Sequence, residues 1–120
     1  MRRLPDVWRV VAGGLGLSAV VIGAIAAHGL TDPQAITSVE RASTYQLVHS
    51  VILVVTTLIS GRAALISRWL LLAGIVLFCG SIYAKYFFDF VNATKFAPTG
   101  GVLLMLGWLS LALSAKGNAK

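Results

Sequence analysis

Four apolar runs, each close to the length of a membrane-spanning helix, take up most of this 120-residue sequence. They extend from about Val7 to Gly29, from Ser43 to Ser60, from Trp69 to Phe88 and from Phe96 to Ser114. A helix needs roughly 20 mostly apolar residues to cross the hydrocarbon core of a bilayer. We therefore predict an all-α fold, a four-helix transmembrane bundle that forms a single integral membrane domain over residues 1–120.

The composition supports a membrane protein and excludes several other classes. Hydrophobic residues make up 58% of the chain and charged residues 12%, whereas soluble domains are about 25% charged. The formal net charge is +6, but no basic stripe with interleaved aromatic residues predicts a nucleic-acid partner. The single cysteine, Cys79, excludes an internal disulfide and a metal site built on paired cysteines. The first run is longer than the apolar core of a secretory signal, so we expect it to be retained as a helix.

The connections between the runs predict the orientation. Thr31-Asp32-Pro33 has a capping side chain followed by proline at a first helical position. We therefore expect a short interfacial helix that begins at about Pro33 and continues into the second span. Cytoplasmic loops carry an excess of Lys and Arg. With four spans, most basic residues fall on the side of the two termini, including a short basic turn with Arg62 and Arg68 (Arg2, Arg3, Arg9, Arg62, Arg68, Lys116 and Lys120, against Arg41, Lys85 and Lys95). Both termini should therefore be cytoplasmic in a multi-pass protein of the bacterial inner membrane, with the Glu40 stretch toward the outer face.

Small residues recur along the predicted spans and predict close helix packing. Ala19, Gly23 and Ala27 are spaced four apart, so they share one helix face, and small residues let membrane helices approach closely. No strand precedes these glycines and no Gly-Lys-Ser/Thr follows them, which argues against a phosphate-binding loop. The predicted packing positions are Gly16, Ala19, Gly23, Ala27, Gly74, Gly80, Gly100, Gly101 and Gly107.

Polar residues concentrate between Glu40 and Ser50, where the second span begins. Helical periodicity places Arg41, Tyr45 and His49 on one face, and such a face should meet protein or water rather than lipid. We expect a polar cluster at the outer end of the bundle, either a closed hydrogen-bonded network or a vestibule for a small solute, an ion or a lipid headgroup. Its candidate members are His28, Glu40, Arg41, Tyr45, Gln46, His49, Ser81 and Thr99.

Catalytic and metal chemistry find little support in these residues. His28 and His49 suggest haem ligands, but His49 lies about 9 Å deeper along its helix. Two histidines with few nearby carboxylates also do not make a typical zinc site. His49 and Ser50 are adjacent, so their side chains diverge by about 100° and form a poor catalytic pair. We therefore predict no enzymatic activity, no metal and no cofactor.

Four short motifs in order resemble a known family. The motifs are Ala26-Ala27-His28-Gly29-Leu30, Glu40-x-Ala42-x-x-Tyr45-Gln46-x-x-His49, Gly80-Ser81-Ile82-Tyr83, and Pro98-Thr99-Gly100-Gly101 with Gly107-Trp108. With these motifs the sequence resembles the domain of unknown function 423 family, the UPF0382 or YgdD-like small inner-membrane proteins of bacteria, which is similar to transmembrane protein 256 of eukaryotes. The resemblance implies four transmembrane helices and no particular reaction.

The small-residue density and the lack of a complete catalytic set favour a non-enzymatic protein that works by packing. It would contact membrane lipid and other membrane-protein chains, as a homo-oligomer or as an accessory subunit of a larger complex. The alternative is a small-solute or ion transporter that uses the outer polar cluster. A redox role is a third hypothesis.

Overall fold

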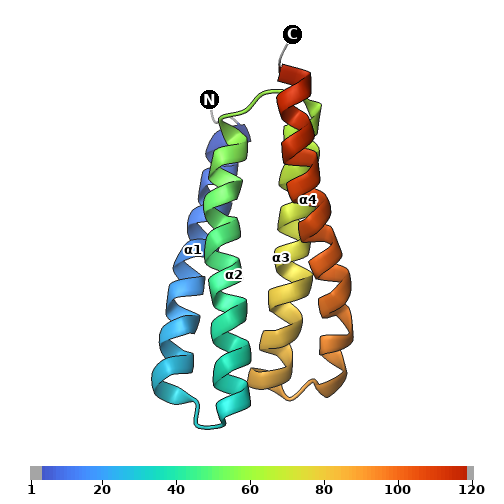
Figure 1. Cartoon of the computed structure of the whole chain (residues 1–120). Coiled ribbons are helices and arrows are strands. Elements are labelled where there is room, and N and C mark those ends of the chain that lie inside the picture. Colours follow the sequence, from blue (N-terminus) through green and yellow to red (C-terminus); the bar gives the residue numbers. More distant parts are fainter. Residues whose placement is uncertain (1–3, 119–120) are drawn as a thin grey trace.

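The computed structural model describes residues 4–118, which form four α-helices and one short 3₁₀ helix, with no strand in that range. Successive helices run antiparallel, so the start of α1 and the end of α4 lie at the same end of the bundle (Figure 1). The all-α bundle expected from the sequence is thus confirmed. The elements are α1 (Leu4–Gly29), α2 (Pro33–Thr57), α3 (Arg62–Phe88), η1 (Val91–Phe96) and α4 (Ala97–Asn118).

Among the described residues, three segments are long and apolar enough to cross a membrane, namely Asp6–Gly29, Arg62–Phe88 and Val91–Ala115. The helix α2 is not among them, because its middle carries the polar residues from Glu40 to His49. Its 25 residues nevertheless span about 37 Å at 1.5 Å per residue, and it lies alongside α1 and α3 (Figure 1). The helix α2 is therefore about as long as its neighbours, although its composition does not mark it as a membrane span.

The start of α2 agrees with the expected helix that begins near Pro33 and continues into the second span. Asp32 caps the helix by accepting a 3.0 Å hydrogen bond from the backbone N–H of Ala35, and Pro33 opens it, as the sequence indicates. From there one continuous helix runs to Thr57, so the expected interfacial segment and second span are a single rod. The expected basic turn is also helical, because α3 begins at Arg62 after Gly61, whose φ of 111° reverses the chain.

Glycine sets how closely α3 and α4 approach. A Cβ added at Gly100 would lie 2.8 Å from the Cα of Phe78, and one added at Gly107 would lie 2.6 Å from Leu71 Cδ2. Phe78 and Leu71 would both have to move to make room for these added atoms. Gly74 shares this interface from the α3 side, where a Cβ would lie 2.7 Å from a methyl carbon of Leu104.

The α1–α2 pair is also built on small residues but is less tight. A Cβ at Gly23 would lie 3.3 Å from Ser43 Oγ, and one at Gly16 would lie 3.9 Å from Ser50 Cβ. These two pairs define the register of the antiparallel helices. Ala19 is buried, whereas Ala27 is exposed, and an added Cβ at Gly80 or Gly101 would meet nothing within 4 Å.

The core extends along the length of the bundle. Near the end that holds the termini, Trp8 packs edge-on to Trp69 with ring centroids 5.0 Å apart. Cys79 is buried and donates its S–H to the carbonyl of Ala42 at 3.2 Å. All four helices contribute side chains, so the core ties them together. The buried cluster comprises Trp8, Ala12, Ala42, Leu53, Leu71, Ile75, Cys79 and Leu104.

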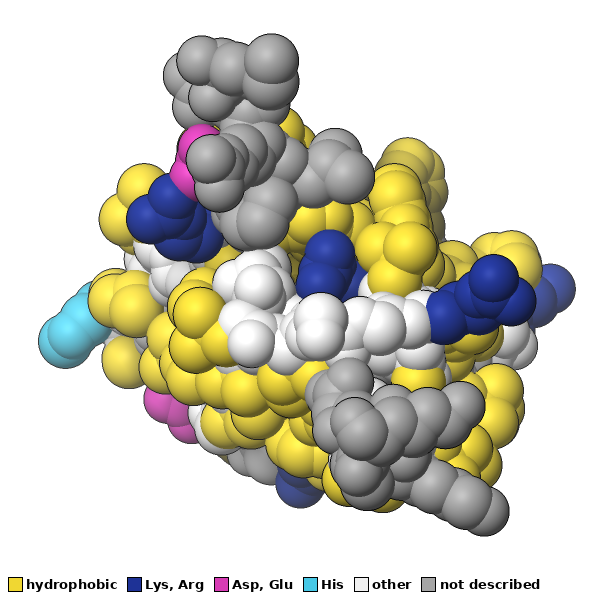
Figure 2. Space-filling view, turned by 90° about the horizontal axis from the view of Figure 1, so that it is seen from above, with side chains coloured by type: hydrophobic (Ala, Val, Ile, Leu, Met, Phe, Trp, Pro, Cys, Tyr) yellow, Lys and Arg dark blue, Asp and Glu magenta, His cyan; other side chains and the backbone are white. Residues whose placement is uncertain are grey.

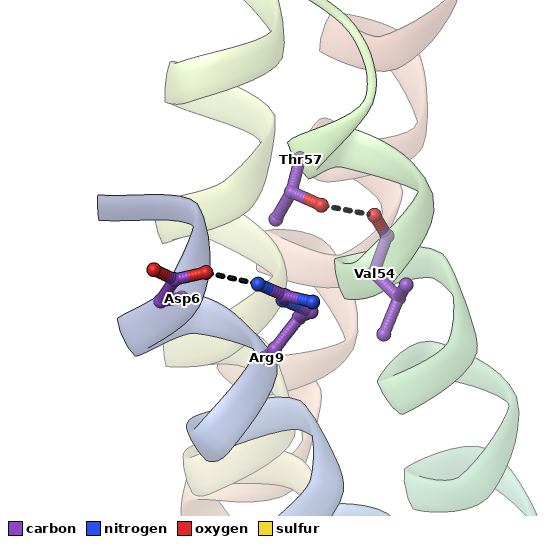
Figure 3. A network of polar contacts seen from close by, with 4 residues as sticks. All are labelled: Asp6, Arg9, Val54 and Thr57. Atoms are coloured by element: carbon purple, nitrogen blue, oxygen red, sulfur yellow. Dashed lines mark hydrogen bonds and ion pairs between the residues drawn. The ribbon is translucent and has the colours of Figure 1, made fainter. Parts of the chain in front are cut away.

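The end of the bundle with the termini is basic. Arg9 pairs with Asp6 on the first turns of α1, close to the last turn of α2, where Thr57 bonds back to the Val54 carbonyl (Figure 3). Seen along the bundle from this end, Lys and Arg side chains sit among hydrophobic ones (Figure 2). Arg2, Arg3 and Lys120, which entered the expected orientation, lie outside the described residues, as does the side chain of Lys116.

Candidate functional site

Gln46 links three helices near the middle of the bundle. Its Nε2 donates to the carbonyl of Leu15 and to Ser18 Oγ on α1, both at 2.7 Å. Its Oε1 accepts a 2.8 Å hydrogen bond from the hydroxyl of Tyr83 on α3. A buried amide in lipid surroundings needs such partners, and both ends of the Gln46 amide have them. The side chain therefore fastens α1 and α3 to α2.

His49, one turn further along α2, joins this helix to α4. Trp108 Nε1–H donates to His49 Nε2 at 3.0 Å, and His49 Nδ1 lies 2.6 Å from the carbonyl oxygen of Tyr45. The indole can only donate and the carbonyl can only accept. The contacts therefore require a neutral imidazole with its proton on Nδ1. Tyr45 stacks on the same ring and packs against Phe78 of α3.

Arg68 forms a third polar contact, which the sequence reasoning missed. Its side chain is only 8% exposed. Its guanidinium donates to the carbonyl and the hydroxyl of Thr56, at 2.8 and 3.3 Å, and lies 5.7 Å from the ring centroid of Trp8. Thr56 lies near the carboxyl end of α2, where the helix dipole favours a cation. The indication in the sequence was that Arg68 is a basic residue close along the chain to the end of the second apolar run.

The other predicted cluster members do not join one network. His28 and Thr99 are exposed near the end of the bundle away from the termini, and Ser81 donates to the Phe78 carbonyl of its own helix. Glu40 and Arg41 are also exposed, so no other helix of the described chain covers this part of the polar face of α2. The structure thus brings Gln46 and His49 into interhelical contacts and leaves the charged pair on the surface.

The buried polar groups offer little for catalysis. Both ring nitrogens of His49 are engaged, and the hydroxyl of Ser50 donates to the carbonyl of Gln46 at 2.6 Å. Within residues 4–118 no three His, Cys, Asp or Glu side chains gather in a way that could hold a metal ion. These polar atoms are therefore engaged in hydrogen bonds within α2 and between helices.

Two of the hollows lined by the described residues differ in character. One, of about 280 Å³, lies between α1 and α3 beside Gln46, Cys79 and Tyr83 and is lined mostly by apolar atoms. The other, of about 420 Å³, lies at the end of the bundle away from the termini, between the α1–α2 and α3–η1 connections, with Asp32, Lys85 and Asp89 in its wall. Only the second presents charged groups.

Long apolar helices, large exposed hydrophobic side chains on every helix and polar groups bonded between helices define a small helical membrane protein. The chain belongs to the family described as protein of unknown function (DUF423), whose model matches residues 22–101. This confirms the resemblance seen in the motifs. A UPF0382 membrane protein of Staphylococcus epidermidis is 38% identical over 112 residues, covering 88% of this chain and 92% of the relative. A UPF0382 membrane protein of Haemophilus influenzae is 34% identical over 105 residues, covering 81% and 83%. No solved structure matches the chain.

Proposed function

We propose that this protein is a non-enzymatic subunit of an assembly in the bacterial inner membrane, and that it acts by packing against other chains. It crosses the membrane four times with both termini in the cytoplasm. The observation that carries the proposal is the use of its buried polar side chains. Gln46, His49 and Arg68 are each bonded across a helix interface, which stabilises a rigid platform and leaves no reactive pair.

The proposed topology rests on α2 and on the distribution of charge. The helix α2 runs antiparallel to α1 and α3 along the bundle (Figure 1). It therefore crosses the membrane together with the three apolar segments, which makes four spans in all. Arg9 and Arg62 lie at the end where α1 begins and α2 finishes. An excess of basic residues marks the cytoplasmic side. Reporter fusions at both termini should give cytoplasmic signals, and a periplasmic signal from either terminus contradicts the topology.

Purification of the full chain in a mild detergent tests the packing role. We expect a defined oligomer or a co-purifying membrane protein at reproducible stoichiometry. The Gly101→Ala variant is a suitable control, because an added Cβ there meets no neighbour and should not change the outcome. A strictly monomeric particle without any partner contradicts the proposal.

The charged hollow at the outer end is the one observation that favours transport as an alternative. Asp32, Lys85 and Asp89 line it, and ionisable groups at the mouth of a membrane bundle often mark solute pathways. Flux of a small anion or cation in reconstituted vesicles, lost on Lys85→Ala, would support this alternative. Absence of flux over a broad solute panel would remove it.

A further inference from the structure

The exposed face of α2 is apolar over about two-thirds of the bilayer. Its large exposed hydrophobic side chains run from Tyr45 to the capping residue Leu58, about 20 Å at 1.5 Å per residue. Those of α1 run from Val7 to Ile25, about 27 Å. The hydrocarbon core is about 30 Å thick. α2 therefore falls short by about 10 Å, on the side toward its first residue.

Polar residues occupy the missing part of the face. Thr37, Glu40, Arg41 and Thr44 are all exposed. The contact of Gly23 with Ser43 fixes the register of α1 and α2. It places Arg41 at about the level of Ile25, which α1 exposes as an apolar side chain. The polar patch of α2 thus lies at a depth where the neighbouring helix faces lipid.

The two charges in this patch are unpaired within the described chain. The ion pair found among residues 4–118 joins Arg9 to Asp6, and neither Glu40 nor Arg41 takes part in one. Charged groups inside a membrane normally pair with one another or face protein. Glu40 and Arg41 have opposite signs, so the patch is complementary to itself.

We propose that the outer half of α2 is the interface with a second copy of this chain, related by a two-fold axis along the membrane normal. Thr37, Thr44 and Val51 are seven residues apart, so they form one line along the exposed face. A seven-residue repeat keeps one line of side chains facing a parallel partner helix. Glu40 and Arg41 lie on opposite sides of that line, about 100° apart. A two-fold axis then pairs Glu40 of each copy with Arg41 of the other.

This interface rests on the proposed packing function and specifies one partner for it. The line of contact also buries the apolar residues toward the inner end, Leu47 and Val51 among them, which extends the interface along α2. Tyr45 lies to one side, against His49 and Phe78, so pairing leaves the contact with α4 intact.

Cysteine cross-linking of the full chain in native membranes tests the interface. In a Cys79→Ala background, Thr44→Cys should give a disulfide-linked homodimer. Val20→Cys, on the exposed face of α1 at a similar depth, should not. Glu40→Arg should lower the Thr44→Cys yield about tenfold, the effect of about 1.4 kcal/mol, because it replaces two attractions with repulsions. The double variant Glu40→Arg/Arg41→Glu should restore the yield.

Each outcome decides between the interface and the broader function. Equal yields from Thr44→Cys and Val20→Cys, or no recovery in the double variant, overturn the two-fold interface. A cross-link from Thr44→Cys to a different membrane protein overturns the second copy as occupant but supports a packing subunit. A monomer without any partner in membranes and in detergent overturns both.

Discussion

Because α3 and α4 are in close contact at Gly100, adding a single methyl group at this position should strongly lower the free energy of unfolding. A Cβ at this position would lie 2.8 Å from the Cα of Phe78 and 2.9 Å from the carbonyl carbon of Leu77. Both neighbours are backbone atoms, which cannot rotate away as a side chain can. The two helices must therefore separate by a substantial fraction of an ångström to accept Gly100→Ala.

Gly101 provides the matched comparison, because an added Cβ there meets nothing within 4 Å. Replacing glycine by alanine in a helix gains up to about 1 kcal/mol in both variants, and that gain cancels when they are compared. Overpacking costs about 1–3 kcal/mol, and rigid backbone neighbours place Gly100 at the upper end. We expect Gly100→Ala to be less stable than Gly101→Ala by about 3 kcal/mol, more than a hundredfold in the folding equilibrium constant.

Equilibrium unfolding of both variants in mixed micelles, followed by circular dichroism or by steric trapping, measures this difference. Tryptophan fluorescence adds a local probe, because Trp108 lies on the same helix as both glycines. If Gly100→Ala is as stable as Gly101→Ala, the helices are not in backbone contact and the reasoning fails.

The three interhelical polar contacts give further predictions. Gln46→Leu should cost roughly 1–2 kcal/mol by the same unfolding assay, and Tyr83→Phe roughly 0.6 kcal/mol, since it removes one of the bonds to Gln46; equal losses would contradict the assigned contacts. Nitrogen-15 NMR of His49 should show a neutral ring protonated at Nδ1, and Trp108→Phe should shift its Nε2 resonance; a protonated Nε2 would rule out the bond to the indole. Arg68→Lys should destabilise the bundle nearly as much as Arg68→Ala, because an ammonium group lacks the planar fork that reaches both Thr56 oxygens; full stability of Arg68→Lys would show that charge alone suffices.

The helices themselves could be predicted from residue order. Asp32 and Pro33 mark the start of α2, and the glycine at position 61 marks the turn before α3, because capping and chain reversal are local properties. The apolar runs predict the bundle because lipid requires every backbone polar group to be satisfied within a helix. The start of α3 at Arg62 rather than near Trp69 was not visible, since basic residues at a helix end look like a connection in sequence.

The partners of the polar residues could not be predicted. Gln46 and His49 stand three residues apart on α2, yet they point to different neighbours, one to α1 and α3 and the other to α4. Their periodicity indicates a polar face but not which helix covers it. Glu40 and Arg41 belong to the same stretch and remain uncovered within the chain.

The sequence by itself determined that this chain is a bundle of long apolar helices, because hydrophobicity and helix start signals depend on residues close together along the chain. Only the tertiary structure decided the contacts of its polar groups. Arg68 reaches the end of α2, and Gly100 meets the backbone at Phe78, since both contacts depend on how helices distant in sequence are aligned and rotated against one another.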